Sequence, residues 1–242
     1  MSTELDPIAP GPSASAPVAR QLSLRERVYL ALRDELMTGR ISPFDRLAEE
    51  RIAERYEVSR TPVREALARL QSDGLVEKRE GGLYLYLPSF HELSGLYELR
   101  VTLELRGIER AIAEVTIHHD RPRLEAELDR WYAFREDRPV PDAGFVAHDE
   151  QFHTTLVDTS GNPALTQALV QVNSRIRAVR MYDYLTENRM TATITEHIEI
   201  AELVVRGHLP AARDALRHHV GASQDVVLER AANALAMTRM MK

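Results

Sequence analysis

The sequence predicts a mainly α-helical protein, with an N-terminal winged helix-turn-helix followed by a C-terminal antiparallel bundle of six helices. Apolar residues recur at spacings of three and four along most of the chain, which is typical of amphipathic helices. The alternation typical of strands occurs in one short stretch before Pro88. Beyond Pro88, long segments with helical spacing follow one another, separated by short breaks rich in Pro, Gly and Asn.

Composition excludes several classes of protein. The chain has 242 residues, of which 44% are hydrophobic and 28% charged, enough for one large or two ordinary globular domains. It has no cysteine, which excludes disulfides, thiolate nucleophiles and iron–sulfur clusters. No apolar run reaches the ~18 residues of a membrane span, and the first 20 residues lack the pattern of a secretion signal, so we expect a cytoplasmic protein.

The net charge of −6 is unevenly distributed along the chain. Residues 21–88 carry equal numbers of basic and acidic side chains, so the excess of acid lies almost entirely in the rest of the chain. A local basic surface in the N-terminal part is therefore compatible with the overall charge.

The N-terminal part begins with a segment unlike the rest. Residues 1–20 are rich in Pro, Ser, Ala and Gly without apolar periodicity, which predicts a disordered arm. A first amphipathic helix is expected from Leu24 to Gly39. A second, shorter helix carries Ile52 and Tyr56 on its apolar face.

A third helix follows, with Val63 and Leu67 on its apolar face and a stop at Gly74. Either Ser59 or Thr61 is expected to cap its N-terminus.

The remaining elements are a β-hairpin and the bundle. Residues 75–79 and 83–87 alternate around Glu80-Gly81-Gly82, which predicts a hairpin. The bundle helices are expected near residues 90–117, 121–137, 143–159, 163–186, 190–206 and 210–238. We therefore divide the chain into an arm (1–20), a winged domain (21–88) and a helical domain (89–242).

The third helix carries features of a nucleic-acid reader. Arg60 and Arg64 are four residues apart and share the face opposite its apolar residues. Arginine can donate two hydrogen bonds to guanine, and Ser59 or Thr61 can reach a phosphate. The pattern alone also fits a solvated helix face with two ordinary arginines.

A longer stretch around this helix resembles a known family. Residues 47–53 and 74–76, with the motif VSRTPVREAL at 58–67, resemble the winged helix-turn-helix of the GntR family of bacterial transcription regulators. The resemblance implies that the helix reads DNA, with four residues at contacting positions: Ser59, Arg60, Thr61 and Arg64. Because one winged domain buries little surface, we expect a homodimer on an inverted repeat in double-stranded operator DNA.

Two features depart from the family pattern. Pro43-Phe44 stands where the family usually has Pro-Gly, and the wing tip contains the acidic Glu80 in place of a basic residue. At the wing, only Lys78 and Arg79 are therefore expected to contact DNA.

The helical domain contains polar residues on otherwise apolar helical stripes. Asp149 and His153 share one stripe with Phe145, Phe152 and Leu156. Two further histidines, on two other helices, lie on similar stripes: His197 and His219. Burying such groups is costly unless they are paired or bound to an ion.

Each of these histidines alone would more often be a hydrogen-bonded core residue than a ligand. One Asp and three His without a thiolate together suit a divalent metal, with Zn²⁺ preferred and Ni²⁺ or Mn²⁺ as alternatives. The other six histidines are expected in solvent or in supporting roles: His91, His118, His119, His148, His208 and His218.

The helical domain also resembles a known domain. The matching segments are residues 97–100 with Glu104, 149–153, 160–163, 196–197 and 216–219. They are similar to the FCD ligand-binding domain of the FadR subfamily, and with the winged domain the resemblance covers nearly all of residues 25–235. It implies that Asp149, His153, His197 and His219 hold a divalent metal, and that a small carboxylate effector completes the coordination.

Arg100 shares a helix face with Glu104 and is the candidate clamp for the effector carboxylate, although a structural Arg–Glu pair is the alternative. The expected function is a metabolite-responsive transcription regulator, acting as a repressor. One alternative is a DNA-binding protein whose metal is purely structural. Another is a metal-dependent enzyme, which is disfavoured because no separate base or nucleophile stands out. The identity of the effector and the operator is not encoded in any motif.

Overall fold

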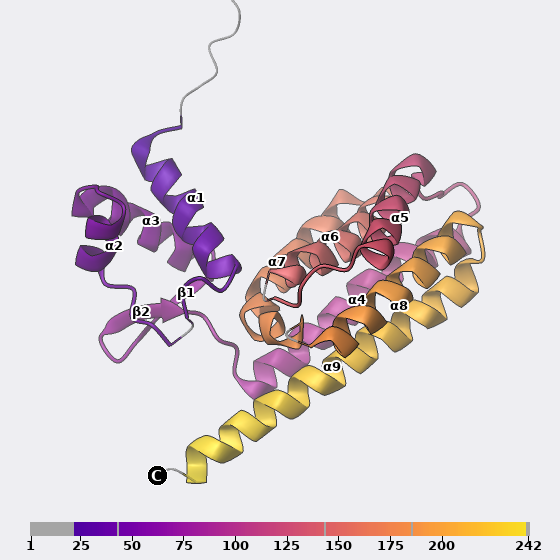
Figure 1. Cartoon of the computed structure of the whole chain (residues 1–242). Coiled ribbons are helices and arrows are strands. Elements are labelled where there is room, and N and C mark those ends of the chain that lie inside the picture. The colour runs from indigo at the N-terminus through magenta and orange to yellow at the C-terminus, as the bar shows by residue number, and fades with distance from the viewer. Residues whose placement is uncertain (1–21, 43, 143, 185, 241–242) are drawn as a thin grey trace, which may run out of the picture.

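The chain forms a winged helix-turn-helix beside an antiparallel helical bundle, as the sequence predicts (Figure 1). The computed structural model describes residues 22–240 except 43, 143 and 185, with side chains through 228 except 182 and 183. The arm predicted over residues 1–20 lies outside the described residues.

The winged part is built on a small core beneath its third helix. Its elements are α1 (Leu24–Met37), α2 (Glu49–Arg55), α3 (Arg60–Ser72), β1 (Val76–Arg79) and β2 (Gly82–Leu85). α1 packs against α3, with Leu32 and Leu36 of α1 and Val63 and Leu67 of α3 fully buried. Burying each such side chain contributes about 1.5–3 kcal/mol, so the apolar stripes of the sequence fix which face of α3 remains outside.

The two strands form the antiparallel hairpin that the sequence predicts. Val76 pairs with Leu85, and Arg79 pairs with Gly82. The two turn residues, Glu80 and Gly81, both have positive φ values, 46° and 75°, as in a type I′ turn. Gly82, which the sequence pattern placed in the turn, is therefore the first residue of β2.

Six helices and a short 3₁₀ turn make up the bundle in the described part of the chain. They are α4 (Phe90–Ala113), α5 (Arg121–Glu136), α6 (Phe145–Asp158), α7 (Pro163–Arg180), η1 (Met181–Tyr184), α8 (Glu187–Val205) and α9 (Leu209–Met240). α4 packs along α9, α5 along α8 and α6 along α7. None of the helices described is long and apolar enough to cross a membrane.

The boundary between α7 and α8 differs from the expected one. A single helix was predicted over 163–186, but the α-helix ends at Arg180 and the chain tightens into η1. Within η1, the hydroxyl of Tyr184 donates to Asp149 of α6 (2.6 Å), a tertiary contact that local sequence does not show. α8 then begins at residue 187, three residues before the start expected near residue 190.

Hydrogen bonds at Tyr86 link the winged part to the bundle, and we call the contact of Tyr86 with Arg175 the Tyr86–Arg175 joint. Arg175 of α7 donates to the hydroxyl of Tyr86 (2.9 Å), just after β2, and its guanidinium lies 5.1 Å from the centre of that ring. The same hydroxyl lies 3.3 Å from Glu92 in the first turn of α4. Glu92 also completes a capping box with Ser89, so the joint contacts two bundle helices at once.

Candidate metal centre and nucleic-acid interface

The outer face of α3 is available to a partner. Arg60 and Arg64 expose 60% and 69% of their side chains, and Thr61 between them is also exposed. Ser59 occupies the N-cap position, but its hydroxyl makes no capping hydrogen bond. The four residues predicted on α3 thus lie together on the surface with polar groups that can reach DNA.

Both arginines make ion pairs with the start of α2. Nη1 of Arg60 lies 2.9 Å from Oε1 of Glu50. Nε and Nη2 of Arg64 each lie 3.2 Å from Oε2 of Glu49. The hydrogen bond to Glu49 raises the pKa of Arg64 further, so the guanidinium stays charged.

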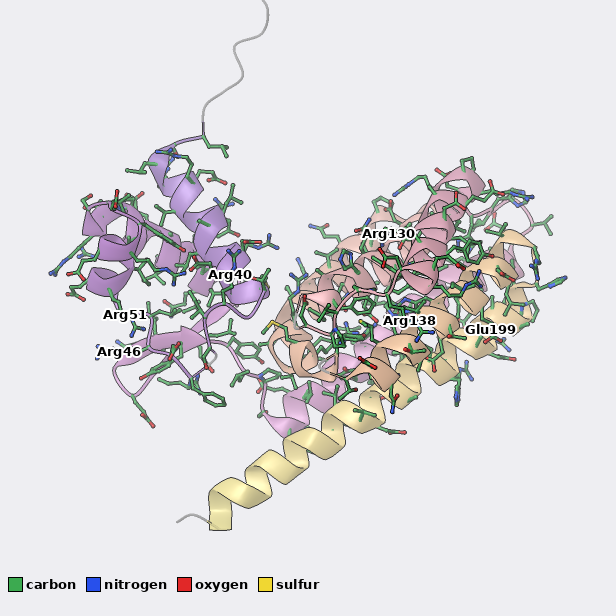
Figure 2. The ribbon with its side chains drawn as sticks, in the orientation of Figure 1. Arg40, Arg46, Arg51, Arg130, Arg138 and Glu199 are labelled. Carbon is green, nitrogen blue, oxygen red and sulfur yellow. The ribbon has the colours of Figure 1, made fainter. Side chains whose placement is uncertain are left out.

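The two residues predicted at the wing differ in their surroundings. Lys78 is exposed, whereas Arg79 is half-buried and bonds within the hairpin, to the carbonyl of Leu85 (3.4 Å) and over the ring of Tyr84. Sequence reasoning missed Arg46, which lies beside the hairpin (Figure 2). A Cβ atom at Gly82 would lie 2.9 Å from its Nε, a proximity that no local motif signals.

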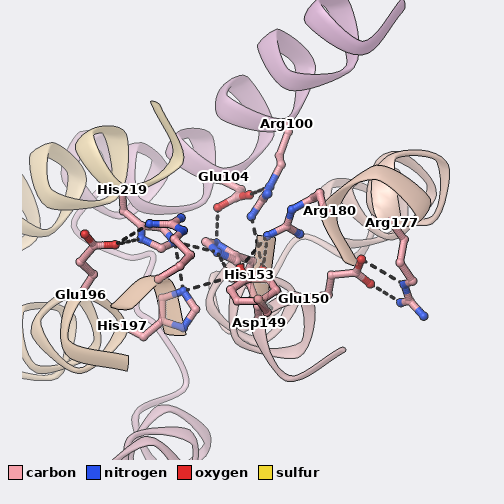
Figure 3. A network of polar contacts seen from close by, with 12 residues as sticks. Arg100, Glu104, Asp149, Glu150, His153, Arg177, Arg180, Glu196, His197 and His219 are labelled. Carbon is pink, nitrogen blue, oxygen red and sulfur yellow. Dashed lines mark hydrogen bonds and ion pairs between the residues drawn. The ribbon is translucent and has the colours of Figure 1, made fainter. Parts of the chain in front are cut away.

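In the bundle, the four predicted metal-binding residues converge (Figure 3). α6 supplies Asp149 and His153, α8 supplies His197 and α9 supplies His219, and each is at most 1% exposed. One ligand atom from each lies within 4.8 Å of all the others. The helical stripes thus bring together residues up to 70 positions apart.

The spacing of these atoms fits a single ion. Nε2 of His219 lies 3.1 Å from Nε2 of His197 and 3.3 Å from Nε2 of His153. Oδ1 of Asp149 lies 3.6 Å from Nε2 of both His153 and His197. Ligand atoms of a tetrahedral zinc ion with bonds of about 2.0–2.1 Å lie about 3.3 Å apart, so the donor set suits such an ion.

Two carboxylates hold the histidines from behind. Nδ1 of His153 lies 2.5 Å from Glu104 on α4, and Nδ1 of His219 lies 2.5 Å from Glu196 on α8. When each Nδ1 carries a proton, the lone pairs of the two Nε2 atoms face one another. Such facing lone pairs repel unless a cation lies between them. This carboxylate–histidine arrangement is typical of metal sites.

The protonation states also favour metal binding. Burial would raise the pKa of Asp149, but Arg180 and the histidines outweigh it and hold the pKa well below its usual range. Burial lowers the pKa of both His197 and His219, so both are neutral. Burial disfavours the charged form of His153, whereas Glu104 favours it, and the pKa of His153 is raised as a result. A metal ion bound to His153 would therefore displace a proton.

Two arginines lie against Asp149 and Glu104. Nε of Arg100 donates to Glu104 (2.6 Å), and Nη2 of Arg180 donates to Asp149 (2.5 Å). Burial raises the pKa of Glu104, but the nearby His153 and Arg100 outweigh burial and lower this pKa to about 2. The Arg100–Glu104 pair weighed from the sequence is thus present, and it borders the metal centre.

Sequence reasoning missed Arg180 and Tyr184. Arg180 could have been found by the signal used for Asp149, because it is a polar residue on the same helical stripe as the buried Val172 and Ile176.

Several buried donors around the centre have no hydrogen-bond partner among the described residues. They are Nη1 and Nη2 of Arg100, Nε and Nη1 of Arg180, and the hydroxyls of Thr193 and Ser223. Thr193 and Ser223 lie one helical turn from His197 and His219. Because unpaired buried donors are costly, this grouping leaves several donors available to a polar ligand at the candidate metal centre.

Aromatic rings close one side of the centre. The ring of Phe152 stacks on His197 with centres 3.8 Å apart, and the ring of Trp131 lies nearly perpendicular to that of His197, with centres 4.3 Å apart. Nε1 of Trp131 donates to Glu127 (2.8 Å), which fixes the indole. These rings exclude water from one side of His197.

The remaining histidines do not belong to the converging group. Five are exposed: His91, His118, His148, His208 and His218. His119 is half-buried, with Nδ1 3.0 Å from the hydroxyl of Thr159.

Comparison with known proteins identifies both halves of the chain. The family model described as "Bacterial regulatory proteins, gntR family" matches residues 24–82, and the model of the FCD domain matches residues 95–222.

Individual relatives agree with these matches. The HTH-type transcriptional regulator YdhC of Bacillus subtilis is 28% identical over 192 residues, 79% of this chain and 85% of its own. An HTH-type regulator from an unstable DNA locus of Streptomyces ambofaciens is 31% identical over 204 residues, 83% of this chain and 84% of its own. A solved GntR regulator from Rhodococcus sp. RHA1 shares the fold, with a TM-score of 0.72 and 24% identity over 85% of this chain and 97% of its own.

Proposed function

Because the chain belongs to the GntR family and carries an FCD domain, it is a DNA-binding transcriptional regulator, and we propose that its helical domain binds a divalent metal and a small carboxylate effector. The family and its relatives are regulators, so the chain is not an enzyme. We further propose that residues 21–88 bind DNA and that residues 89–242 bind the effector and form the dimer.

The observation that carries the metal proposal is the convergence of three imidazole nitrogens and one carboxylate oxygen. Asp149, His153, His197 and His219 would hold the ion, and Zn²⁺ suits this donor set best, with Ni²⁺ or Mn²⁺ as alternatives. The ion would supply positive charge and open coordination positions for an oxygen ligand. Glu104 and Glu196 would orient two of the histidines.

Charge supports a carboxylate as the effector. The buried carboxylates Asp149 and Glu104 are balanced by the buried guanidiniums of Arg100 and Arg180. A divalent cation would add two positive charges, and Glu196, the nearest further carboxylate, already lies 3.9 Å from Arg189. An anionic ligand would offset the added charge, and the Nη atoms of Arg100, which make no hydrogen bond to the residues described, could donate to it.

At the DNA, we propose contacts from Ser59, Arg60, Thr61 and Arg64 of α3, with Lys78 and Arg79 at the wing. Both arginines are exposed, so the edges of DNA bases can reach their guanidiniums. The effector would then release the operator, as expected of a repressor. A homodimer would read an inverted repeat, and footprinting tests this: two symmetric protected half-sites are expected, and protection of a single half-site contradicts it.

Elemental analysis and operator titration test the metal and effector. The purified protein should carry about one divalent ion per chain, and His219→Ala should lower that occupancy. Carboxylic acids should weaken operator binding by the wild type and have no effect on His219→Ala. A metal-bound protein that no acid affects would favour a purely structural metal, whereas a metal-free native protein would refute the site.

Band shifts test the DNA assignment. Arg60→Ala and Arg64→Ala should each weaken operator binding by about 1–3 kcal/mol, because each removes two hydrogen bonds to one guanine. Circular dichroism should be unchanged, since both side chains are exposed. Unaltered operator affinity in both variants would refute the assignment.

A further inference from the structure

The ion pair of Glu49 with Arg64 differs in geometry from that of Glu50 with Arg60. The Glu49 carboxylate lies along one side of the Arg64 guanidinium, against Nε and Nη2 (3.2 Å each to Oε2, and 3.3 Å from Nε to Oε1). The contacts with Glu49 involve Nε and Nη2, so Nη1 of Arg64 stays outside this ion pair. Glu50, by contrast, takes an end nitrogen of Arg60, Nη1 (2.9 Å).

This difference matters for base reading. Arginine contacts guanine through two parallel N–H groups. A carboxylate on the Nε side of Arg64 leaves the Nη1 and Nη2 edge free for a base while restricting the rotation of a long side chain. Holding one such side chain in advance avoids an ordering cost equivalent to about 2- to 10-fold in affinity.

From this geometry we propose that Glu49 is a positioning residue for DNA recognition, which orients Arg64 and thereby sharpens the choice of base that Arg64 reads. The inference rests on the proposed function of Arg64 as a DNA reader. Its location supports the role: Glu49 begins α2, the helix that packs against α3, so its backbone is fixed relative to Arg64. Its side chain is also less exposed than that of Arg64, 31% against 69%.

Selection from random duplex DNA tests the proposal, using the full-length protein. The wild type defines the preferred sequence, and Arg64→Ala and Arg60→Ala identify the base pair that each arginine reads. Glu49→Ala should weaken the preference by about 2- to 10-fold at the base pair of Arg64 and leave that of Arg60 unchanged. Glu49→Asp should restore part of the preference, because it restores the charge.

Two control variants separate positioning from loss of charge. Glu50→Ala removes another acid from the first turn of α2 and should leave the base pair of Arg64 unaffected. Glu54→Gln removes an exposed charge one turn along α2 and should affect neither base pair. In an Arg64→Ala background, Glu49→Ala should cause no further loss of preference.

The outcomes are distinct. Equal loss at every base pair, or the same effect from Glu49→Ala and Glu54→Gln, overturns the role of Glu49 while leaving Arg64 as a reader. Unchanged base preference in Arg64→Ala overturns the proposed reading by Arg64 itself. Circular dichroism of each variant identifies any loss that comes from unfolding.

Discussion

Two neighbouring histidines in this chain have different surroundings. His118 is exposed, whereas the adjacent His119 is half-buried and lies against Thr159. The hydroxyl of Thr159 donates to the carbonyl of Leu156, so its oxygen can accept a hydrogen bond from the Nδ1–H group of a neutral His119. Burial lowers the pKa of His119 to about 4.

The lowered pKa predicts a pH dependence of stability. In the unfolded chain His119 takes up a proton near its ordinary pKa of about 6.5, whereas in the folded chain it stays neutral until about pH 4. The folded protein should therefore lose about 1–3 kcal/mol of unfolding free energy from this group as the pH falls through that window. Urea unfolding of wild type and His119→Asn at pH 7.5 and 5 measures it, with a smaller decrease expected in the variant.

His118→Asn is the matched control, since it removes an exposed imidazole one residue away. It should show the wild-type dependence on pH. The interpretation fails if both variants respond to pH alike.

At the scale of helices, local sequence predicted most of what the structure contains. The stripe that carries Asp149 and His153 could be read because a helical repeat is a local property, and the same holds for His197 and His219. The contacts of Glu104 with His153 and of Arg180 with Asp149 join helices whose relative register no local pattern specifies.

The ends of helices were likewise predictable where a local contact sets them and not where a distant contact does. The start of α7 was predictable from Asn162 and Pro163, because Asn162 accepts from the backbone of Ala164 (3.1 Å) in a local cap. Its end was not, because η1 forms where Tyr184 bonds to Asp149 across the bundle.

The N-terminus of α4 should depend on its capping box. Ser89 accepts from the backbone N–H of Glu92, and the Glu92 carboxylate accepts from the backbone N–H of Ser89 (3.0 Å). Ser89→Ala should lower the unfolding free energy by about 1 kcal/mol. Ser94→Ala makes the same chemical change inside α4, where alanine favours the helix, and should not destabilise. Chemical denaturation of both checks this, and equal losses would contradict the cap.

At the scale of the whole molecule, α7 connects the candidate metal centre with the winged part. Its residue Arg180 bonds to Asp149, and its residue Arg175 bonds to Tyr86. A ligand changes DNA affinity only if it favours one arrangement of the two parts, so a direct link between them is where such coupling is expected to act.

Breaking the Tyr86–Arg175 joint should therefore uncouple the two sites. Tyr86→Phe and Arg175→Ala should keep the metal content and the operator affinity of the ligand-free protein, while the effect of carboxylic acids on that affinity should shrink. Arg177→Ala, which breaks an ion pair inside the bundle with Glu150, should retain the full response. Operator titrations with and without acid measure it, and a wild-type response in Arg175→Ala would rule out this link.

Trp131 is the single tryptophan of the chain and touches His197 edge-on. Its fluorescence consequently comes from one place, next to the candidate metal centre. Ions with partly filled d shells, such as Ni²⁺ or Co²⁺, should quench this emission when added to metal-stripped protein, whereas Zn²⁺ should alter it without quenching. His197→Ala should abolish the saturable part of the signal, so the protein carries its own optical reporter of ion entry.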